Sequence, residues 1–365
     1  MRRHVRNSRR KTVRLTDFGW NDRLESIFNT DFKDKYSPAR VIRVDRGAVA
    51  VQGADETVAA VVAGTLDPAG EVGQPAVGDW VALDLGADTA VVRAILPRVG
   101  ALSRRRPGEA DHAQAVAANV DVVFIVESVE RGPNPRRIER AVALAWDAGA
   151  TPVVVVTKTD LCDDLETAVE KAREGAPFSE IVALSAVDGS GVNELLEHLP
   201  PGTTAVLLGP SGVGKSTLTN RLLGEERLAI SHVREGDAKG RHTTTHRELV
   251  VLPSGGCLID TPGIRELGLW LGAKAVDSAF PEIEARADCC RFGDCRHEAE
   301  PGCAVIEAVK AGEIDRKRLD SYHRLLREAE HLEERLDPAR RHEIRARERG
   351  FGKMIRQALK IKNRR

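Results

Sequence analysis

A phosphate-binding loop is indicated by nine residues in the second half of the chain. The segment GPSGVGKST, Gly209 to Thr217, matches the pattern G-x-x-x-x-G-K-[ST], follows the apolar run TAVLL and opens the helical pattern TLTNRLLG. Glycines let backbone N–H groups crowd around phosphate oxygens, and the helix N-terminus adds a partial positive charge. We therefore expect Lys215 to reach the terminal phosphates of a nucleotide and Ser216 to bind Mg²⁺.

Two further motifs indicate which nucleotide this loop would hold. DTPG, Asp260 to Gly263, follows the apolar run CLI and suits the Mg²⁺-organising acid and the γ-phosphate-sensing glycine of a GTPase. TKTD, Thr157 to Asp160, is similar to the guanine-reading motif [NT]KxD, in which the carboxylate accepts two hydrogen bonds from guanine N1 and N2. Adenine offers no such pair of donors, so the motif favours GTP over ATP.

A third base contact is indicated by position alone. LSA, residues 184–186, follows another apolar run, and the backbone N–H of Ala186 can meet guanine O6. The residues expected to bind GTP are Thr157, Lys158, Asp160, Ser185, Ala186, Gly209, Pro210, Ser211, Gly212, Val213, Gly214, Lys215, Ser216 and Thr217.

The order of these motifs is a circular permutation of the usual one. Ordinary GTPases place the phosphate loop first and the base reader late, whereas this chain runs TKTD, LSA, GPSGVGKS, GRHTTTH and DTPG. Permutation is feasible because neighbouring strands, not chain order, build the site, and termini can be moved between surface loops. DTPG now leads directly into the C-terminal region, which we expect to respond to the nucleotide.

A cluster of cysteines and one histidine predicts a structural metal site. The segment CRFGDCRHEAEPGC, Cys290 to Cys303, offers the spacing C-x4-C-x-H-x5-C. Four such ligands suit tetrahedral Zn²⁺ and leave no open position for catalysis, so the metal would stabilise a segment with little core of its own. Cys289 competes with Cys290 as the first ligand. Cys162 and Cys257 have the sequence context of ordinary core residues.

The elements that must position these motifs form a predicted α/β domain. Continuous apolar runs at 120–129, 152–157, 181–184, 204–208 and 257–259 are typical of strands in a parallel sheet that is covered on both faces. Amphipathic segments between them, such as 136–150 and 191–199, predict the covering helices and a doubly wound fold. Ligands bind such sheets at the carboxyl ends of the strands, where each motif falls.

A separate small β-barrel is predicted before this domain. Residues 40–98 alternate short β-branched runs with turn residues, which favours a five-stranded OB-type barrel, a fold that commonly binds oligonucleotides. Trp80 is the one aromatic residue in that stretch, so we expect RNA contacts mainly through backbone and shape. The sequence pattern of residues 315–336 predicts a helix, which is followed by the basic C-terminal tail.

Charge is distributed unevenly along the 365 residues, although the formal net charge is zero. Residues 1–14 carry seven Lys or Arg and no acid, and residues 340–365 carry eleven against two Glu, which leaves 37 basic and 53 acidic residues between them. Two positive ends on an acidic body favour a polyanionic partner. No apolar run has the roughly 20 residues of a membrane helix, and a polar segment follows the basic start, so we expect neither membrane insertion nor secretion.

Together the permuted order, the β-rich domain ending in ANVD, the segment GRHTTT and the Cys/His cluster resemble the ribosome small-subunit-dependent GTPase A family (RsgA, also called YjeQ). The resemblance covers roughly residues 38–310, and one departure from it is Thr157, which stands where Asn is commoner and supplies fewer hydrogen bonds. It favours Cys290 over Cys289, giving the zinc ligands Cys290, Cys295, His297 and Cys303.

The same resemblance assigns the switch loop to GRHTTTH, Gly240 to His246. Thr244 is then the expected Mg²⁺ and γ-phosphate sensor, with Thr243 and Thr245 as alternatives. Ile264 follows DTPG where a Ras-type enzyme holds a water-orienting Gln, so slow intrinsic turnover is expected, and His242 is a hypothesis for the missing polar group. The predicted catalytic residues are Lys215, Thr244, His242 and Gly263, and the magnesium ligands are Ser216, Thr244 and Asp260.

The resulting expectation is a cytoplasmic, monomeric GTP hydrolase of five segments. These are a basic extension (1–37), an OB-type barrel (38–100), a permuted GTPase domain (112–275), a zinc-binding helical module (276–335) and a basic tail (336–365). The resemblance implies that it binds GTP and GDP, docks on the small ribosomal subunit and its rRNA, and acts late in maturation of that subunit. Two alternatives remain: a guanylate-kinase-like nucleotide kinase, whose phosphate loop is similar, and a non-catalytic RNA-binding scaffold.

Overall fold

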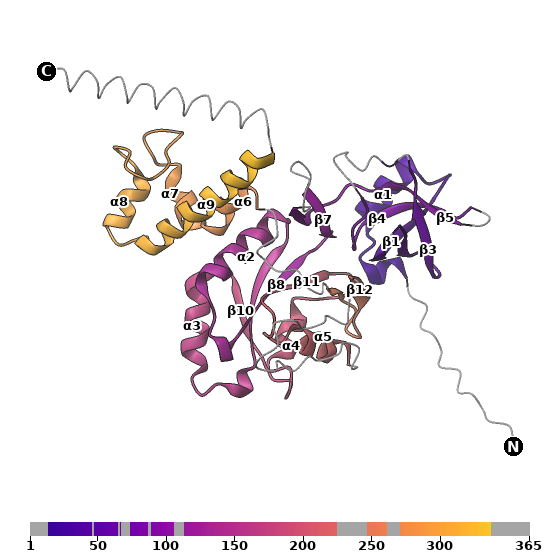
Figure 1. Cartoon of the computed structure of the whole chain (residues 1–365), viewed down its shortest axis with the longest axis horizontal. Coiled ribbons are helices and arrows are strands. Elements are labelled where there is room, and N and C mark those ends of the chain that lie inside the picture. The colour runs from indigo at the N-terminus through magenta and orange to yellow at the C-terminus, as the bar shows by residue number, and fades with distance from the viewer. Residues whose placement is uncertain are drawn as a thin grey trace. The chain divides into compact units, whose positions relative to one another are not determined.

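The computed structural model describes residues 14–45, 47–64, 66, 74–86, 89–105, 113–224, 247–260 and 271–336. The chain divides into two compact units, one made of residues 1–103 and 114–269 and the other of residues 104–113 and 270–365 (Figure 1). No helix in the described ranges is long and apolar enough to cross a membrane.

Five strands of the first unit form a small barrel. They are β1 (Ser37–Val44), β2 (Val49–Gln52), β3 (Thr57–Val62), β4 (Trp80–Asp84) and β5 (Ala90–Ile95). Their order is β1-β2-β3-β5-β4, and β4 pairs back onto β1 to close the barrel. The interior holds small and β-branched side chains, among them Val41, Val51 and Val92, each fully buried. The predicted five-stranded barrel is therefore confirmed.

An aromatic cluster joins the segment before β1 to this barrel. The 3₁₀ helix η1 (Leu15–Phe18) and helix α1 (Asp22–Asp31) lie within the stretch that the sequence assigned to a basic extension. The ring of Trp20 contacts Trp80 of β4, with centroids 4.9 Å apart, and Phe28 of α1, at 5.9 Å. Because Trp80 is buried in this cluster, its ring is not available to stack on a nucleobase.

The remainder of the first unit is a mostly parallel sheet covered by helices. Its strands are β8 (Val122–Ser128), β9 (Thr151–Thr157), β10 (Glu180–Ala183), β11 (Thr204–Leu208), β12 (Glu248–Val251) and β13 (Cys257–Asp260). They lie in the order β10-β9-β8-β11-β13-β12, all parallel except β12. This arrangement confirms the doubly wound α/β fold.

Helices pack on both faces of this sheet because its strands are apolar on both. The helices are α2 (Pro135–Asp147), α3 (Leu165–Gly175), α4 (Val192–Glu197) and α5 (Lys215–Leu223). Leu195 of α4 and Leu218 of α5 pack with Phe124 of β8 in one buried cluster, whereas α2 and α3 contact each other on the opposite face (Figure 1). Burial on both sides explains the continuous apolar runs in the sequence.

Backbone pairing joins the barrel to the α/β sheet. β12 pairs with β1 of the barrel, with Arg43 opposite Glu248, so one sheet of eleven strands runs through both parts. The buried guanidinium of Arg40 reinforces this junction by donating to the carbonyls of Phe18, Gly78 and Asn119. Two further strands, β6 (Ala101–Arg105) and β7 (Ala113–Ala118), form a separate ladder.

The part of the second unit that the structure describes, residues 271–336, contains four helices around a small core. They are α6 (Ala273–Ala279), α7 (Pro281–Ala287), α8 (Ala304–Lys310) and α9 (Arg316–Leu336). The rings of Phe280 and Tyr322 meet edge to face at 5.7 Å, and the guanidinium of Arg318 lies over Phe280 at 4.1 Å. The helical module predicted at the C-terminal side is present, and the Cys/His segment lies between α7 and α8.

Candidate functional site

The predicted nucleotide motifs meet because the strands that precede them are parallel. β9, β10, β11 and β13 end at Thr157, Ala183, Leu208 and Asp260, and all four run in the same direction as β8. Parallel strands bring their carboxyl ends to one edge of a sheet. TKTD, LSA, GPSGVGKST and the first residue of DTPG therefore begin at the same edge, in spite of their order along the chain.

The phosphate loop depends on glycine at its two ends. Gly209 has φ +152°, and a Cβ there would lie 2.3 Å from the carbonyl oxygen of Val126 in the neighbouring strand. Gly214 caps α5 with φ +93°, a conformation that side chains disfavour. The Nζ of Lys215 donates to the carbonyls of Gly209 and Pro210 at 2.6 and 2.7 Å. The ammonium group is thus held over the loop at the start of α5.

The base-reading motif and the LSA motif contact each other directly. The hydroxyl of Ser185 donates to Oδ1 of Asp160 at 2.6 Å and accepts from the backbone N–H groups of Val187 and Asp188. Ser185 is fully buried, whereas Lys158 adopts a left-handed backbone conformation with φ +61°. The turn after β9 is therefore fixed with one carboxylate oxygen of Asp160 already bonded within the protein.

Thr157 connects the base-reading motif to the phosphate loop. Its hydroxyl oxygen lies 2.5 Å from the carbonyl oxygen of Val213 and 2.9 Å from that of Glu127. The side chain is buried, and a Cβ on Gly214 would be 3.7 Å from the same hydroxyl. The two motifs, 56 residues apart in the chain, are thus in hydrogen-bonding contact.

Two acidic residues that sequence reasoning missed lie beside these motifs. Glu130 pairs with Lys158, whose hydrogen bond and charge lower the pKa of that carboxyl. Glu127 is buried and receives two hydrogen bonds of 2.6 Å from Arg137 of α2. Both residues belong to ESVE, which follows the apolar residues of β8 at its carboxyl end. This position could have indicated them, because residues at that edge of a parallel sheet face the site.

Part of the predicted site lies outside the described residues. This applies to His242, Thr243, Thr244, Thr245, Gly263 and Ile264. Asp260 is described: it is the last residue of β13 and lies opposite Glu248 of β12. Its predicted partner Ser216 is in the first turn of α5 and is exposed.

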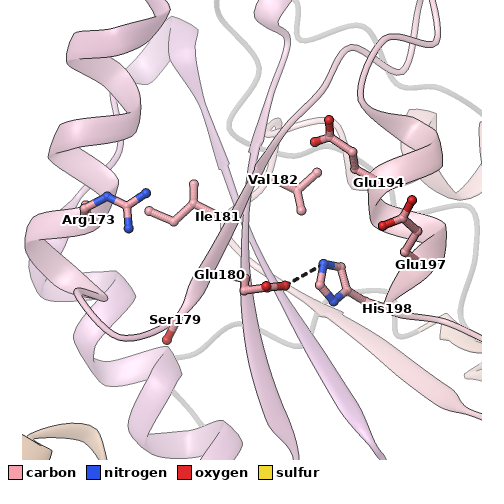
Figure 2. Close-up of a pocket in the computed structure, with 8 residues that line it drawn as sticks. All are labelled: Arg173, Ser179, Glu180, Ile181, Val182, Glu194, Glu197 and His198. Atoms are coloured by element: carbon pink, nitrogen blue, oxygen red, sulfur yellow. Dashed lines mark ion pairs between the residues drawn. The ribbon is translucent and has the colours of Figure 1, made fainter.

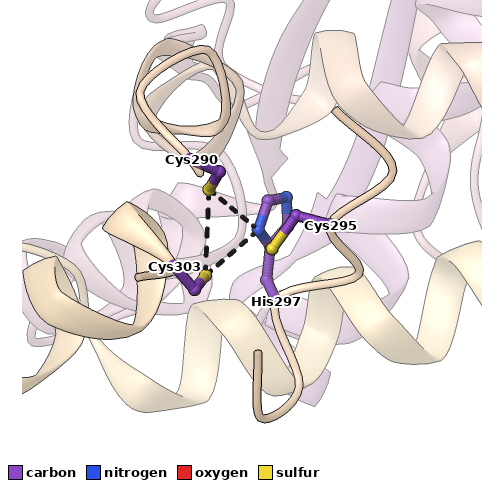
Figure 3. Close-up of side chains that lie close together, drawn as sticks. All are labelled: Cys290, Cys295, His297 and Cys303. Atoms are coloured by element: carbon purple, nitrogen blue, oxygen red, sulfur yellow. Dashed lines mark hydrogen bonds between the residues drawn. The ribbon is translucent and has the colours of Figure 1, made fainter. Parts of the chain in front are cut away.

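The Cys/His segment forms a compact set of metal-ligating atoms. Sγ of Cys290 lies 3.9 Å from Sγ of Cys303 and 3.6 Å from Nδ1 of His297, and the last two atoms are 3.4 Å apart (Figure 3). With Cys295, the four ligand atoms all lie within 4.8 Å of one another. Burial lowers the pKa of His297 and so favours the neutral imidazole that binds metals. This cluster can bind a metal ion.

The adjacent residues Cys289 and Cys290 differ in their position relative to the cluster. Cys289 is exposed and is not part of the cluster among the described residues, whereas Cys290 points into it (Figure 3). Cys303 also caps α8, with Sγ accepting from the backbone N–H of Ile306 at 3.4 Å. Cys257 is fully buried, and Cys162 is half-buried.

An open cavity of about 480 Å³ lies elsewhere on the first unit. It is bounded by α3, β10 and α4, and its lining includes Arg173, Glu180, Glu194 and Glu197 (Figure 2). His198 pairs with Glu180 across it at 3.0 Å. None of the predicted nucleotide or metal residues lines this cavity, so it is not the candidate site.

The fold and this site define a circularly permuted GTPase. The chain superimposes on a crystal structure of YjeQ from Thermotoga maritima with a TM-score of 0.61, 27% identity and coverage of 80% of this chain and 98% of that one. The fold is also that of YloQ, described as a circularly permuted GTPase, with a TM-score of 0.60, 24% identity and coverage of 81% and 95%.

Sequence comparison identifies the family. Residues 95–270 match the family model described as RsgA GTPase. The small ribosomal subunit biogenesis GTPase RsgA of Streptomyces coelicolor is 41% identical over 351 residues, which cover 95% of each chain. The protein belongs to the RsgA GTPase family, and the resemblance extends beyond residues 38–310.

Proposed function

We propose that this protein hydrolyses GTP when it is bound to the small ribosomal subunit and acts late in the maturation of that subunit. The observation that carries the proposal is the contact between base reader and phosphate loop through Thr157 and Val213. One nucleotide can then span Asp160 and Lys215. Relatives named small ribosomal subunit biogenesis GTPase supply the identity of the partner.

The residues of the site have distinct proposed roles. Asp160 accepts from guanine N1 and N2, and its hydrogen bond from Ser185 holds it in place. The backbone N–H groups of the phosphate loop and the ammonium of Lys215 stabilise the negative charge that develops on the phosphates. Ser216, Thr244 and Asp260 would hold Mg²⁺, which neutralises phosphate charge when bound.

The water that attacks GTP would be positioned in the complex with the small subunit. Ile264 has an aliphatic side chain and cannot orient water, so hydrolysis by the free protein would be slow. His242 is the proposed polar group, acting when the protein is bound to the subunit. Gly263 would contact the γ-phosphate through its backbone N–H.

The metal of the second unit is proposed to be Zn²⁺ in a structural role. Tetrahedral zinc with bonds of about 2.3 Å to sulfur and about 2.0–2.1 Å to nitrogen separates two sulfurs by about 3.8 Å and sulfur from nitrogen by about 3.6 Å. The corresponding separations here are 3.9 Å and 3.4 to 3.6 Å. Four protein ligands leave no coordination position for substrate. This donor set is that of a structural zinc site and not of a catalytic one.

The five predicted segments, a monomeric state and a cytoplasmic location remain part of the proposal. The barrel and the basic ends would contact rRNA. The helical module would also dock on the small subunit. The partner is an intracellular ribonucleoprotein, which supports the location.

Hydrolysis assays on the full-length protein test the proposal. GTP and ATP turnover should be measured with and without purified small subunits, and GTP turnover alone should rise strongly with subunits. Lys215→Ala should lower stimulated turnover about a hundredfold or more. Lys171→Ala, a matched loss of an exposed lysine on α3, should leave it unchanged. Equal turnover of ATP and GTP would reject guanine selection.

The same samples decide between the two alternatives. A guanylate-kinase-like enzyme would phosphorylate GMP in the steady state without subunits. A non-catalytic scaffold would bind RNA equally well with GTP and with GDP and would show no stimulated turnover.

A further inference from the structure

An exposed aromatic side chain lies at the tip of the loop between the first two cysteines of the metal cluster. Phe292 is 42% exposed, and Arg291, Gly293 and Asp294 beside it are exposed as well. Of the phenylalanines in the described ranges, one other, Phe178 on the first unit, is exposed, at 67%. Phe292 is therefore not part of the buried core of its module, and its exposed face is available for contacts.

Hydrogen bonds fix the backbone of the loop that carries this ring. Cys290 and Cys295 flank it, and the backbone N–H of Cys295 donates to the carbonyl of Phe292 at 3.3 Å, which closes a turn. The backbone N–H of Arg291 donates to the carbonyl of Gly302 at 3.1 Å, and a Cβ on Gly302 would lie 3.2 Å from the Cβ of Arg291. Because the backbone under the ring is already fixed, less conformational entropy is lost when a ligand binds.

A guanidinium group accompanies the ring. Cζ of Arg291 lies 5.5 Å from the centroid of Phe292. The neighbouring Arg286 and Arg296 are paired with Glu313 and Glu330, whereas Arg291 has no carboxylate partner in the part of the chain that the structure describes. The tip thus presents a planar ring next to a cation that is available to bind.

The chemistry of the tip selects one class of ligand. Asp288 and Asp294 lie close in sequence on either side of it, so the tip is not a cluster of cations for neutralising phosphates. A planar apolar ring with one guanidinium instead suits a nucleobase, which stacks on the ring while the guanidinium contacts its edge or π-face. Bases are free to stack in this way in single-stranded loops, bulges and ends of RNA.

We propose that Phe292 and Arg291 form a stacking site for one unpaired base of small-subunit rRNA. This inference rests on the proposed function for its partner and adds the contact that the helical module makes. It also supplies a stacking surface that the barrel lacks, because Trp80 is buried.

A binding assay tests this site. It measures the affinity of the full-length, metal-loaded protein for purified small subunits in the presence of a non-hydrolysable GTP analogue. Phe292→Ala should weaken binding about tenfold, as expected for loss of one base–aromatic stack. Phe292→Trp should restore affinity to within about threefold of wild type, and Phe292→Leu should behave like Phe292→Ala. Phe178→Ala, the matched control, should bind like wild type, and every variant should retain its metal.

Crosslinking identifies what the tip touches. With p-benzoylphenylalanine at position 292, irradiation should join the protein to rRNA, and the same group at position 178 should not. A crosslink from position 292 to a ribosomal protein would overturn the inference, as would full affinity of Phe292→Ala or Phe292→Leu. If wild type binds subunits but Phe292→Ala is unaffected, the stacking site alone fails. If wild type does not bind at all, the proposed function fails with it.

Discussion

The hydroxyl of Thr157 lies 2.5 Å from the carbonyl oxygen of Val213, so the end of β9 is bonded to the middle of the phosphate loop. The carbonyl of Glu127, at 2.9 Å, is a second acceptor for the same hydroxyl. A hydroxyl has one hydrogen, whereas the carboxamide of Asn has two. The departure from Asn at this position therefore leaves two carbonyls sharing a single donor, with the base and phosphate readers connected through it.

Removing this hydroxyl should weaken nucleotide binding. In Thr157→Val, the buried carbonyls of Val213 and Glu127 lose their shared donor, which costs about 1–3 kcal/mol. We expect the Kd for a fluorescent GDP analogue to rise about tenfold, while Thr157→Ser stays near wild type. Thr167→Val makes the same substitution at an exposed position on α3, where it removes a hydroxyl bond to Asp164, and serves as the control. Unchanged GDP affinity in Thr157→Val would show that the contact does not support the site.

Changing Asp160 to Asn should alter base selection. The amide keeps an oxygen for the hydrogen bond from Ser185 but cannot accept from both guanine donors, so the Kd for GDP should rise about a hundredfold. Xanthine carries a carbonyl where guanine carries its amino group, so XDP should now compete better than GDP. Displacement of a fluorescent nucleotide measures both. Asp164→Asn, which preserves the N-cap of α3, should leave GDP preferred.

Adjacent cysteines should differ in their effect on metal content. Cys290→Ser removes a ligand, and we expect bound zinc, measured by elemental mass spectrometry, to fall from one equivalent toward none. The second unit should then melt at lower temperature, because the proposed metal would contribute to its folding. Cys289→Ser changes an exposed thiol outside the cluster and should retain the full equivalent. Equal zinc loss in both variants would reject this ligand assignment.

Replacing Arg40 should destabilise the junction between barrel and α/β sheet. Arg40→Met leaves the carbonyls of Phe18 and Asn119 without their guanidinium donor, whereas the carbonyl of Gly78 keeps its second donor, Nδ2 of Asn119, so we expect a loss of about 3 kcal/mol. Urea unfolding followed by tryptophan fluorescence reports this, since Trp80 lies under the guanidinium at 5.1 Å. Arg93→Met breaks a half-exposed ion pair with Asp84 in the same barrel and should cost about 0–1 kcal/mol. Similar losses in both would contradict a special role for Arg40.

Local patterns predicted much of the fold. The apolar runs of the sheet and the alternating runs of the barrel were readable because each strand's burial leaves a periodic trace in its own residues. The pairing between β1 and β12 could not be predicted from the sequence. A register such as Arg43 opposite Glu248 is set by the packing of elements about two hundred residues apart. The helix α1 was hidden for a related reason: its composition does not reveal its place, which follows from the ring of Phe28 packing on Trp20 and that of Trp20 on Trp80 of the barrel.

By itself the sequence determined the chemistry within each motif: the glycines of the phosphate loop, the acid at position 160 and the spacing of the four candidate metal ligands. These depend on residues close together, whose geometry the local backbone fixes. Tertiary structure alone decided that Thr157 bonds to Val213 and that Phe292 is exposed. Each depends on how distant backbone segments pack, and no short stretch of sequence records that packing.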